Sequence, residues 1–408
     1  MYSTAVLTAL PKTDLHCHLD GSLRLETLIE LSRDRGLPLP SDTPDGLRAL
    51  VFKDSYRDLA DYLHGFSFTS RVLDDAESLE RVAYELGQDG LAENVCYLEV
   101  RLAPQLHIRA DLDVADVLCA VDRGLARAQR EDEASAEVQA GLRPPFRYGL
   151  IACAMRMFTA GFSPYYKRLM DVLPGWPAKE VYSIASQSLA RAVVDARDRL
   201  GLPVVGFDLT GHEAGHPAAH HVEAYSYAHQ HFLKKAVNAG EAYGPQSIFQ
   251  AITLLKADRI GHGTRLFAAD QVQSPKAELY VDQLTEYIAD RRITIEACVT
   301  SNMQTIPTIR RVEDHPVGEM IRRRLSVSLC TDNRLLSHTS ATQELDKTCR
   351  AFDLEVDDLR NIVLHGFKRS FFPGTYRAKR AYVRQAIDCF DRVCAAHGLQ
   401  RTRRTPST

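Results

Sequence analysis

The stretch TDLHCHL, residues 13 to 19, decides the fold class because it is the first of eight short apolar runs that recur along the chain. The other runs are VCYLEVRLAP (95 to 104), FRYGLIACAMR (146 to 156), LPVVGFDLTG (202 to 211), KKAVNAG (234 to 240), DRIGHG (258 to 263), ITIEACV (293 to 299) and LSVSLCTDN (325 to 333). Stretches long enough for a helix separate them. Eight such strand-and-helix units predict a (β/α)8 TIM barrel, whose active site lies at the C-terminal ends of the strands.

The composition is that of an ordinary globular chain. Of its 408 residues 45% are hydrophobic and 25% charged, and the net charge is -3. Without a basic excess, a nucleic acid polymer is excluded as a partner and a small molecule is favoured. The N-terminus lacks a basic leader, and no run reaches the roughly 18 apolar residues of a membrane span, so we expect a cytoplasmic protein without membrane contact. Nine cysteines without a CxxC pair indicate reduced core residues.

The connection from Leu19 to Val95 is long enough for extra helices after strand 1. Helical spacing puts four apolar side chains of YRDLADYLHGF on one face, namely Leu59, Tyr62, Leu63 and Phe66. This face either packs in the core or forms a lid over the barrel mouth. We expect an exposed loop at 129–144 and a disordered tail at 401–408. The chain is predicted to be a single domain spanning 1–408.

Polar side chains gather where the predicted strands end. His16 and His18 are two apart on the first strand and so share a face, and Asp20 follows them. His262 ends the sixth strand in GHG, and Asp332 ends the eighth in TDN. A single histidine is more often a satisfied core residue. Two histidines, a distant histidine and an aspartate at one rim instead indicate a metal centre with a group that handles water.

At these residues the sequence resembles the adenosine deaminases of the metal-dependent amidohydrolase superfamily. The resemblance runs from about residue 11 to 372. Its motifs are PKTDLHCHLDGS (11 to 22), VCYLEVRLAP, CAMR (153 to 156), DLTGHE (208 to 213), NAGEAYGP (238 to 245), RIGHGTRL (259 to 266), TSNMQT (300 to 305) and TDN (331 to 333). The resemblance implies one Zn²⁺ per chain and hydrolytic deamination of a 6-aminopurine nucleoside, adenosine to inosine and ammonia.

Residue roles follow from the resemblance. His16 and His18 match a zinc-binding pair, and Asp332 matches the zinc-binding carboxylate. Glu241 matches the acid that protonates N1 of the purine. His262 matches the histidine that orients and deprotonates the zinc-bound water.

Substrate-binding positions are implied in the same way. Asp20 and Gly211 match positions that hold the sugar and purine N3. Leu59, Tyr62, Leu63 and Phe66 match an apolar gate, which favours the lid.

Asn238 departs from the family pattern, because the resemblance implies a histidine ligand in HAGE where this chain has NAGE. An amide oxygen is a weak ligand for zinc. Three alternatives follow: a weakened site that still binds metal, a non-catalytic purine-binding relative, or replacement of the ligand by another histidine. His212 in the histidine-rich stretch 212–231 is the candidate replacement. HEAGH there also matches the HExxH peptidase pattern, but Gly215 and Pro217 argue against the helix which that motif needs.

A second departure is Asn333, where the family has an aspartate beside purine N7. Ring N7 accepts hydrogen bonds and an amide NH2 donates them, so purine binding is retained. Arg334 follows and admits a further alternative, a phosphorylated or N6-substituted adenine as substrate, against an ordinary ion pair. The sequence does not predict the oligomeric state.

Overall fold

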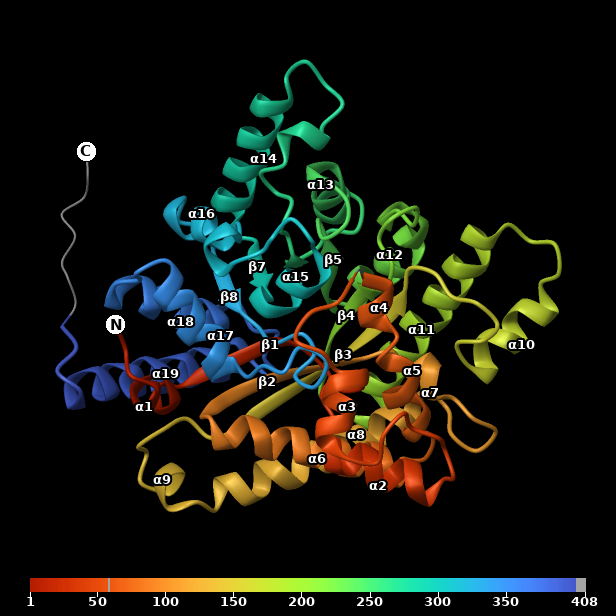
Figure 1. Ribbon diagram of the computed structural model, residues 1–408, viewed down its shortest axis with the longest axis horizontal. Coiled ribbons are helices and arrows are strands. Elements are labelled where there is room, and N and C mark those ends of the chain that lie inside the picture. Colours follow the sequence, from red (N-terminus) through yellow and green to blue (C-terminus); the bar gives the residue numbers. More distant parts are fainter. Residues whose placement is uncertain (58, 401–408) are drawn as a thin grey trace.

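Eight parallel strands form the centre of the molecule (Figure 1). The computed structural model describes residues 1–57 and 59–400, and the predicted tail at 401–408 lies outside that part. The strands are β1 (Lys12–His18), β2 (Val95–Leu102), β3 (Arg147–Met155), β4 (Val204–Thr210), β5 (Lys234–Ala239), β6 (Arg259–His262), β7 (Thr294–Ala297) and β8 (Val327–Leu329). Each pairs with the next in chain order, and each overlaps one predicted apolar run. The predicted (β/α)8 barrel is confirmed.

The first and last strands meet just beyond the end of β8. The backbone N–H of His18 donates to the carbonyl oxygen of Asp332 at 2.7 Å, and the N–H of Asp332 donates to the carbonyl oxygen of His16, also at 2.7 Å. These two bonds form the parallel bridge between Cys17 and Asp332. The seam of the barrel therefore lies at residues predicted to bind metal.

Helices surround the strands in Figure 1. They are α1 (Thr4–Ala9), α2 (Leu25–Asp34), α3 (Pro44–Leu50), α4 (Leu59–Leu63), α5 (Phe66–Thr69), η1 (Ser70–Val72), α6 (Ala76–Ala92), α7 (Pro104–His107), α8 (Val114–Glu133), α9 (Ala136–Gln139), α10 (Pro164–Val172), α11 (Ala178–Leu200), η2 (Ala218–His221), α12 (Val222–Gln230), α13 (Pro245–Thr253), η3 (Ala269–Gln271), α14 (Ala277–Arg291), α15 (Val299–Thr305), η4 (Val312–Asp314), α16 (Val317–Arg322), α17 (Ala341–Ala351), α18 (Val356–Arg369) and α19 (Tyr376–Ala396). Several lie between β1 and β2, which confirms the predicted extra helices. Within the described ranges, we find no helix with the length and apolar character that a bilayer crossing requires.

Local sequence explains where the long helices begin and end. The Asp75 side chain accepts from the backbone N–H of Ser78 at 2.7 Å and caps α6. Asp113 and Asp116 form a reciprocal capping box at the start of α8. Gly201 ends α11 with a φ of 68°, a conformation that glycine adopts without a Cβ clash.

The expected loop at 129–144 is exposed over most of its length, but as far as residue 139 it is mostly helical. Helix α8 continues to Glu133, and α9 follows it directly. Asp132 is buried, accepts from the backbone N–H of Phe146 at 2.7 Å and pairs with Arg143. The charged residues that suggested a solvated loop instead pair with each other and fix the chain in front of β3.

Charged side chains fill part of the barrel interior. Arg101 from β2 donates to Asp208 of β4 at 2.7 Å and also to Glu296 of β7. Arg259 from β6 donates to Glu296 Oε1 at 2.5 Å and pairs with Glu99. Removing one partner from such a buried network leaves an uncompensated charge, which is strongly destabilising. The network therefore ties together four strands.

Folding stability should fall in mild acid because of His107 on α7. This histidine is buried, its Nδ1 lies 3.0 Å from the carbonyl oxygen of Leu73, and burial lowers its pKa from 6.5 to about 4. Since the unfolded chain gains the proton first, stability is full above pH 6.5 and is lost as the pH falls towards 4. In urea titrations at pH 7 and pH 5, H107Q should lose about 2 kcal/mol less than the wild type.

The matched control is H397Q, since His397 is exposed directly after α19. H397Q should keep the wild-type dependence on pH. An equal loss of stability in H107Q and the wild type would contradict the assignment.

Candidate active site

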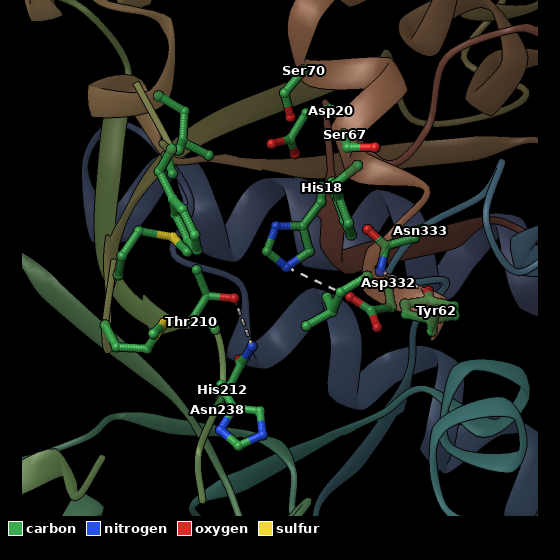
Figure 2. Close-up of a pocket in the computed structure, with 18 of the residues that line it drawn as sticks. His18, Asp20, Tyr62, Ser67, Ser70, Thr210, His212, Asn238, Asp332 and Asn333 are labelled. Atoms are coloured by element: carbon green, nitrogen blue, oxygen red, sulfur yellow. Dashed lines mark hydrogen bonds and ion pairs between the residues drawn. The ribbon is translucent and has the colours of Figure 1, made fainter. Parts of the chain in front are cut away.

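The residues predicted to bind metal meet at the C-terminal mouth of the barrel. His16 and His18 belong to β1, and Asp332 follows β8. The Nε2 atoms of the two histidines are 3.3 Å apart, and each lies 3.5 Å from Asp332 Oδ1. Figure 2 shows His18 pointing towards Asp332. Two ligands about 2.1 Å from a tetrahedral zinc ion are themselves about 3.4 Å apart. The three side chains therefore fit a zinc ion.

His262 lies beside this group. One ligand atom from each of His16, His262 and Asp332 lies within 4.8 Å of the others. His262 Nε2 is also 3.9 Å from Glu241 Oε2, so the predicted base and the predicted acid are adjacent. The structure brings together the metal-binding and proton-transferring residues expected from the sequence.

The histidines differ in electrostatic environment. Burial lowers the pKa of His16 well below 6.5 and that of His18 to about 3, so both are neutral, as metal ligands must be. Burial opposes the charge of His262 too, but the carboxylates of Glu241 and Asp332 outweigh it and raise its pKa. His262 is therefore the better proton acceptor.

Backbone strain marks two of these positions. His262 has a φ of 65° and Asp332 a φ of 61°. Residues other than glycine seldom adopt such left-handed conformations, and when they do they cluster at functional sites. The strained turns aim both side chains at the same point above β1.

Glu296 of β7 fixes the first histidine. Its Oε2 lies 3.1 Å from His16 Nδ1, and the side chain pairs with Arg101 and Arg259 on its other sides. A carboxylate on Nδ1 leaves Nε2 for a metal and raises the basicity of the ring. Sequence reasoning missed this residue, because its position inside an apolar run indicated only a strand.

Helix α15 places one polar side chain against each of three site residues. Ser301 Oγ donates to Asp332 Oδ2 at 2.6 Å and Thr305 Oγ1 donates to Glu241 Oε1 at 3.0 Å, while Asn302 Nδ2 lies 3.0 Å from His262 Nδ1. The motif TSNMQT contains all three side chains, but a motif does not tell which partner each one faces.

A cavity of about 410 Å³ opens above the site. Figure 2 shows its polar residues converging from several strand ends. The predicted residues that line it are His18, Asp20, Tyr62, Leu63, Phe66, Gly211, Asn238, Glu241, His262, Asp332 and Asn333. Sequence reasoning missed its apolar wall, which includes Leu106, Met155 and Phe162. This volume is that of a small-molecule site.

The face predicted as core or lid borders this cavity. Tyr62 is buried, while Leu63 and Phe66 are half-buried, and all three line the cavity. Leu59 begins α4, but its side chain lies outside the described part of the structure. The described side chains therefore both pack against the core and cover the pocket.

Two polar groups in the cavity have an oxygen without a hydrogen-bond partner among the described residues. Burial raises the pKa of Asp20 to about 7, and its Oδ1 has no partner. Asn333 donates through Nδ2 to Tyr62 Oη at 2.8 Å, and its Oδ1 has none. Buried polar atoms are normally paired, so both oxygens mark positions for ligand donors. The Asn333 NH2 group carries two hydrogens, so its bond to Tyr62 leaves the second to donate to a ligand.

Comparison with known proteins places these features in a family. The family model for adenosine deaminase matches residues 11–164 and 177–388. The adenosine deaminase of Mycobacterium sp. (strain KMS) is 35% identical over 370 residues, covering 90% of this chain and 92% of its own. The chain belongs to the adenosine deaminase family.

Solved structures share the fold. A zinc-bound amidohydrolase from Burkholderia ambifaria has a TM-score of 0.76 at 19% identity and covers 97% of this chain and 95% of its own. Arabidopsis ADAL complexed with IMP has a TM-score of 0.71 at 22% identity and covers 95% of this chain and 98% of its own.

Asn238 is where the chain departs from the motif expected in this family. Its Oδ1 lies 3.3 Å from Arg101 Nη1, and its Nδ2 lies 3.5 Å from Thr210 Oγ1. The amide oxygen is thus directed into the buried charge network. Asn238 lines the cavity, but its amide oxygen, the hydrogen-bond acceptor of the side chain, faces the Arg101 guanidinium.

His212, the candidate replacement ligand, also lines the cavity. Its ring is exposed, with Nδ1 3.0 Å from the carbonyl oxygen of Ala214, whereas the candidate ligand atoms of His16, His262 and Asp332 are buried and lie within 4.8 Å of one another. Arg334 forms an ion pair with Glu93 and is not among the residues that line the cavity with Asp20. Its guanidinium therefore binds a carboxylate of the protein and does not face the pocket where a phosphate would lie.

N238H should raise zinc affinity by at least tenfold, because loss of a supporting residue alone typically costs 10-fold to 100-fold. Zinc retention during competition with a chelator measures this. N238Q is the control, since it keeps an amide and adds no imidazole. Equal retention in N238H and wild type would mean that the other ligands are not arranged around one ion.

Proposed function

We propose that this protein hydrolyses adenosine to inosine and ammonia with one zinc ion per chain. The observation that carries the proposal is the pairing of Glu241 and His262, whose Oε2 and Nε2 atoms are 3.9 Å apart, beside His16, His18 and Asp332, whose facing atoms lie 3.3 to 3.5 Å from one another. Membership of the adenosine deaminase family supports it. A nucleoside fits the cavity volume.

Zinc, when bound, supplies a water molecule acidified to near neutral pKa as the nucleophile. His262 accepts a proton from this water as the oxygen attacks C6 of the purine. Glu241 donates a proton to ring N1, which offsets the negative charge that develops when the ring loses aromaticity. The C6–N bond then breaks, and the amino group leaves as ammonia after taking the proton from His262. The remaining proton on the new oxygen returns to Glu241.

Charge in the pocket favours a nucleoside over a nucleotide. Asp20, Glu241 and Asp332 all line the cavity, whereas Arg71 is the single arginine or lysine among its described lining residues. Asp20, whose pKa burial raises to about 7, is partly ionised at neutral pH, and its negative form would repel a phosphate beside it. The Asp20 oxygen without a partner instead suits a sugar hydroxyl, which donates.

The second candidate function is purine binding without catalysis, which Asn238 motivates. Ammonia release from adenosine, measured with zinc content on the same sample, separates the two. A zinc-loaded protein that binds adenosine but releases no ammonia would rule out the deaminase.

E241Q should reduce kcat by about 10² to 10⁴-fold, the range that a positioned general acid contributes. Zinc content should stay at the wild-type level, because Glu241 is assigned to proton transfer and not to the metal. Steady-state ammonia release with zinc analysis gives both numbers. T253V, which replaces an exposed hydroxyl on α13 that bonds only within its helix, serves as a control with unchanged kcat. An E241Q enzyme with wild-type turnover would assign the acid role elsewhere.

The D20A variant should lose the preference for adenosine, which carries the sugar, over free adenine. A hydrogen bond to a charged group contributes about 1.5–3 kcal/mol, so the kcat/KM for adenosine should fall by about 10-fold to 100-fold. The kcat/KM for free adenine, which lacks the sugar, should change little. An equal loss on both substrates would show that Asp20 acts on the site as a whole.

A further inference from the structure

Glu213 is the glutamate of DLTGHE and HEAGH, and neither the metal site nor the pocket uses it. It follows the end of β4 by three residues and is 3% exposed. A carboxylate so deeply buried needs several donors to be stable. Its donors come from the loop after β5, which contains Glu241.

Five donors surround the Glu213 carboxylate. Four are consecutive backbone N–H groups, those of Gly240 to Oε1 at 2.9 Å and of Glu241, Ala242 and Tyr243 to Oε2 at 3.0, 2.6 and 3.0 Å. The fifth is the Ser247 hydroxyl, which donates to Oε1 at 2.5 Å. The loop between β5 and α13 is wrapped around this side chain as a backbone nest is wrapped around an anion.

Arg156, at the end of β3, holds the strand just before this loop. Its Nη2 donates to the carbonyl oxygen of Asn238 at 2.6 Å and its Nη1 to that of His216 at 2.7 Å. Arg156 Nη2 also lies 4.0 Å from Glu213 Oε1. The backbone at the end of β5 and in the loop after it is therefore held by two charged side chains. The Arg156 guanidinium binds the carbonyl oxygen of Asn238, and the Glu213 carboxylate binds the N–H groups of residues 240–243.

We propose that Glu213 is a positioning residue for the reaction, which sets the direction of the Glu241 side chain by anchoring the backbone of residues 240–243. The proposal rests on the proposed function of Glu241 as proton donor. Thr305 contacts only the end of the Glu241 side chain, at Oε1. Glu213 fixes its backbone N–H, and Arg265 Nε donates to its carbonyl oxygen at 2.9 Å, so these contacts together define where the carboxyl group lies relative to purine N1.

Glutamate is suited to this role because an ionised carboxylate only accepts hydrogen bonds. Glutamine has nearly the same shape, but one of its two terminal groups is an NH2, which cannot accept a hydrogen bond from an N–H. The loop N–H groups that face this NH2 lose their acceptor. Misplacement of a catalytic group by about 1 Å costs about 10²-fold in rate. E213Q should therefore lower kcat by about 100-fold.

The experiment compares wild type, E213Q, S247A and D132N as full-length zinc-loaded protein. KM for adenosine should stay within about threefold in E213Q while kcat falls, since the loss arises in the transition state. Hydrogen exchange should accelerate by at least about tenfold in E213Q at those amides of residues 240–243 that lose their acceptor. Zinc content should not change.

Two controls separate positioning from general stability. S247A removes one donor from the same carboxylate and leaves all four loop N–H bonds, so its kcat should stay within about twofold of wild type. D132N alters another buried carboxylate that accepts from a backbone N–H, at the opposite end of β3, so it should lower stability without changing kcat or exchange at 240–243.

The outcomes are distinct. An E213Q enzyme with wild-type kcat and wild-type exchange at 240–243 overturns the positioning role while leaving the deaminase in place. Equal losses of kcat in E213Q and D132N overturn it as well, because the effect would then follow stability. Absence of ammonia release by the zinc-loaded wild type overturns the proposed function itself, which the exchange measurement does not depend on.

Discussion

The two backbone hydrogen bonds between β1 and the residues after β8 are the constraint on which the rest of the structure depends. They join His18 to Asp332 and Asp332 to His16, each at 2.7 Å. Because these bonds belong to candidate metal ligands, the contacts that close the barrel also fix the candidate site. Residues more than 300 positions apart in sequence thereby reach ligand spacing.

Inside the barrel, buried charge supports that geometry. Glu296 accepts hydrogen bonds from Arg101 and Arg259 and also contacts the His16 ring. The same carboxylate therefore belongs to the interior network and borders the candidate metal site. Asn238 joins the same network through Arg101. A neutral amide beside a guanidinium is compatible with this network, which explains how the barrel accommodates the departure from the family motif. We expect a weaker metal affinity as the consequence, because an imidazole nitrogen is a stronger zinc ligand than an amide oxygen.

Periodicity and strand-end chemistry predicted the barrel and most of the site. The eight apolar runs each overlap a strand, and His16, His18, His262 and Asp332 lie together at the barrel mouth. Sequence reasoning failed where long-range pairing decides the structure. The charges at 129–144 suggested a loop, yet Asp132 is buried against Arg143. Ser301, Asn302 and Glu213 were visible within motifs, but their acceptors and donors lie on other strands.

The sequence by itself determined the number of strands, their order and the chemical types gathered at their C-terminal ends, because these depend on local apolar runs and on the parallel direction of successive units. Only the tertiary structure decided which way each side chain turns: the Asn238 oxygen towards Arg101, and the Glu213 carboxylate into the loop of Glu241. Those directions depend on donors and acceptors supplied by other strands, whose positions are fixed when the barrel closes.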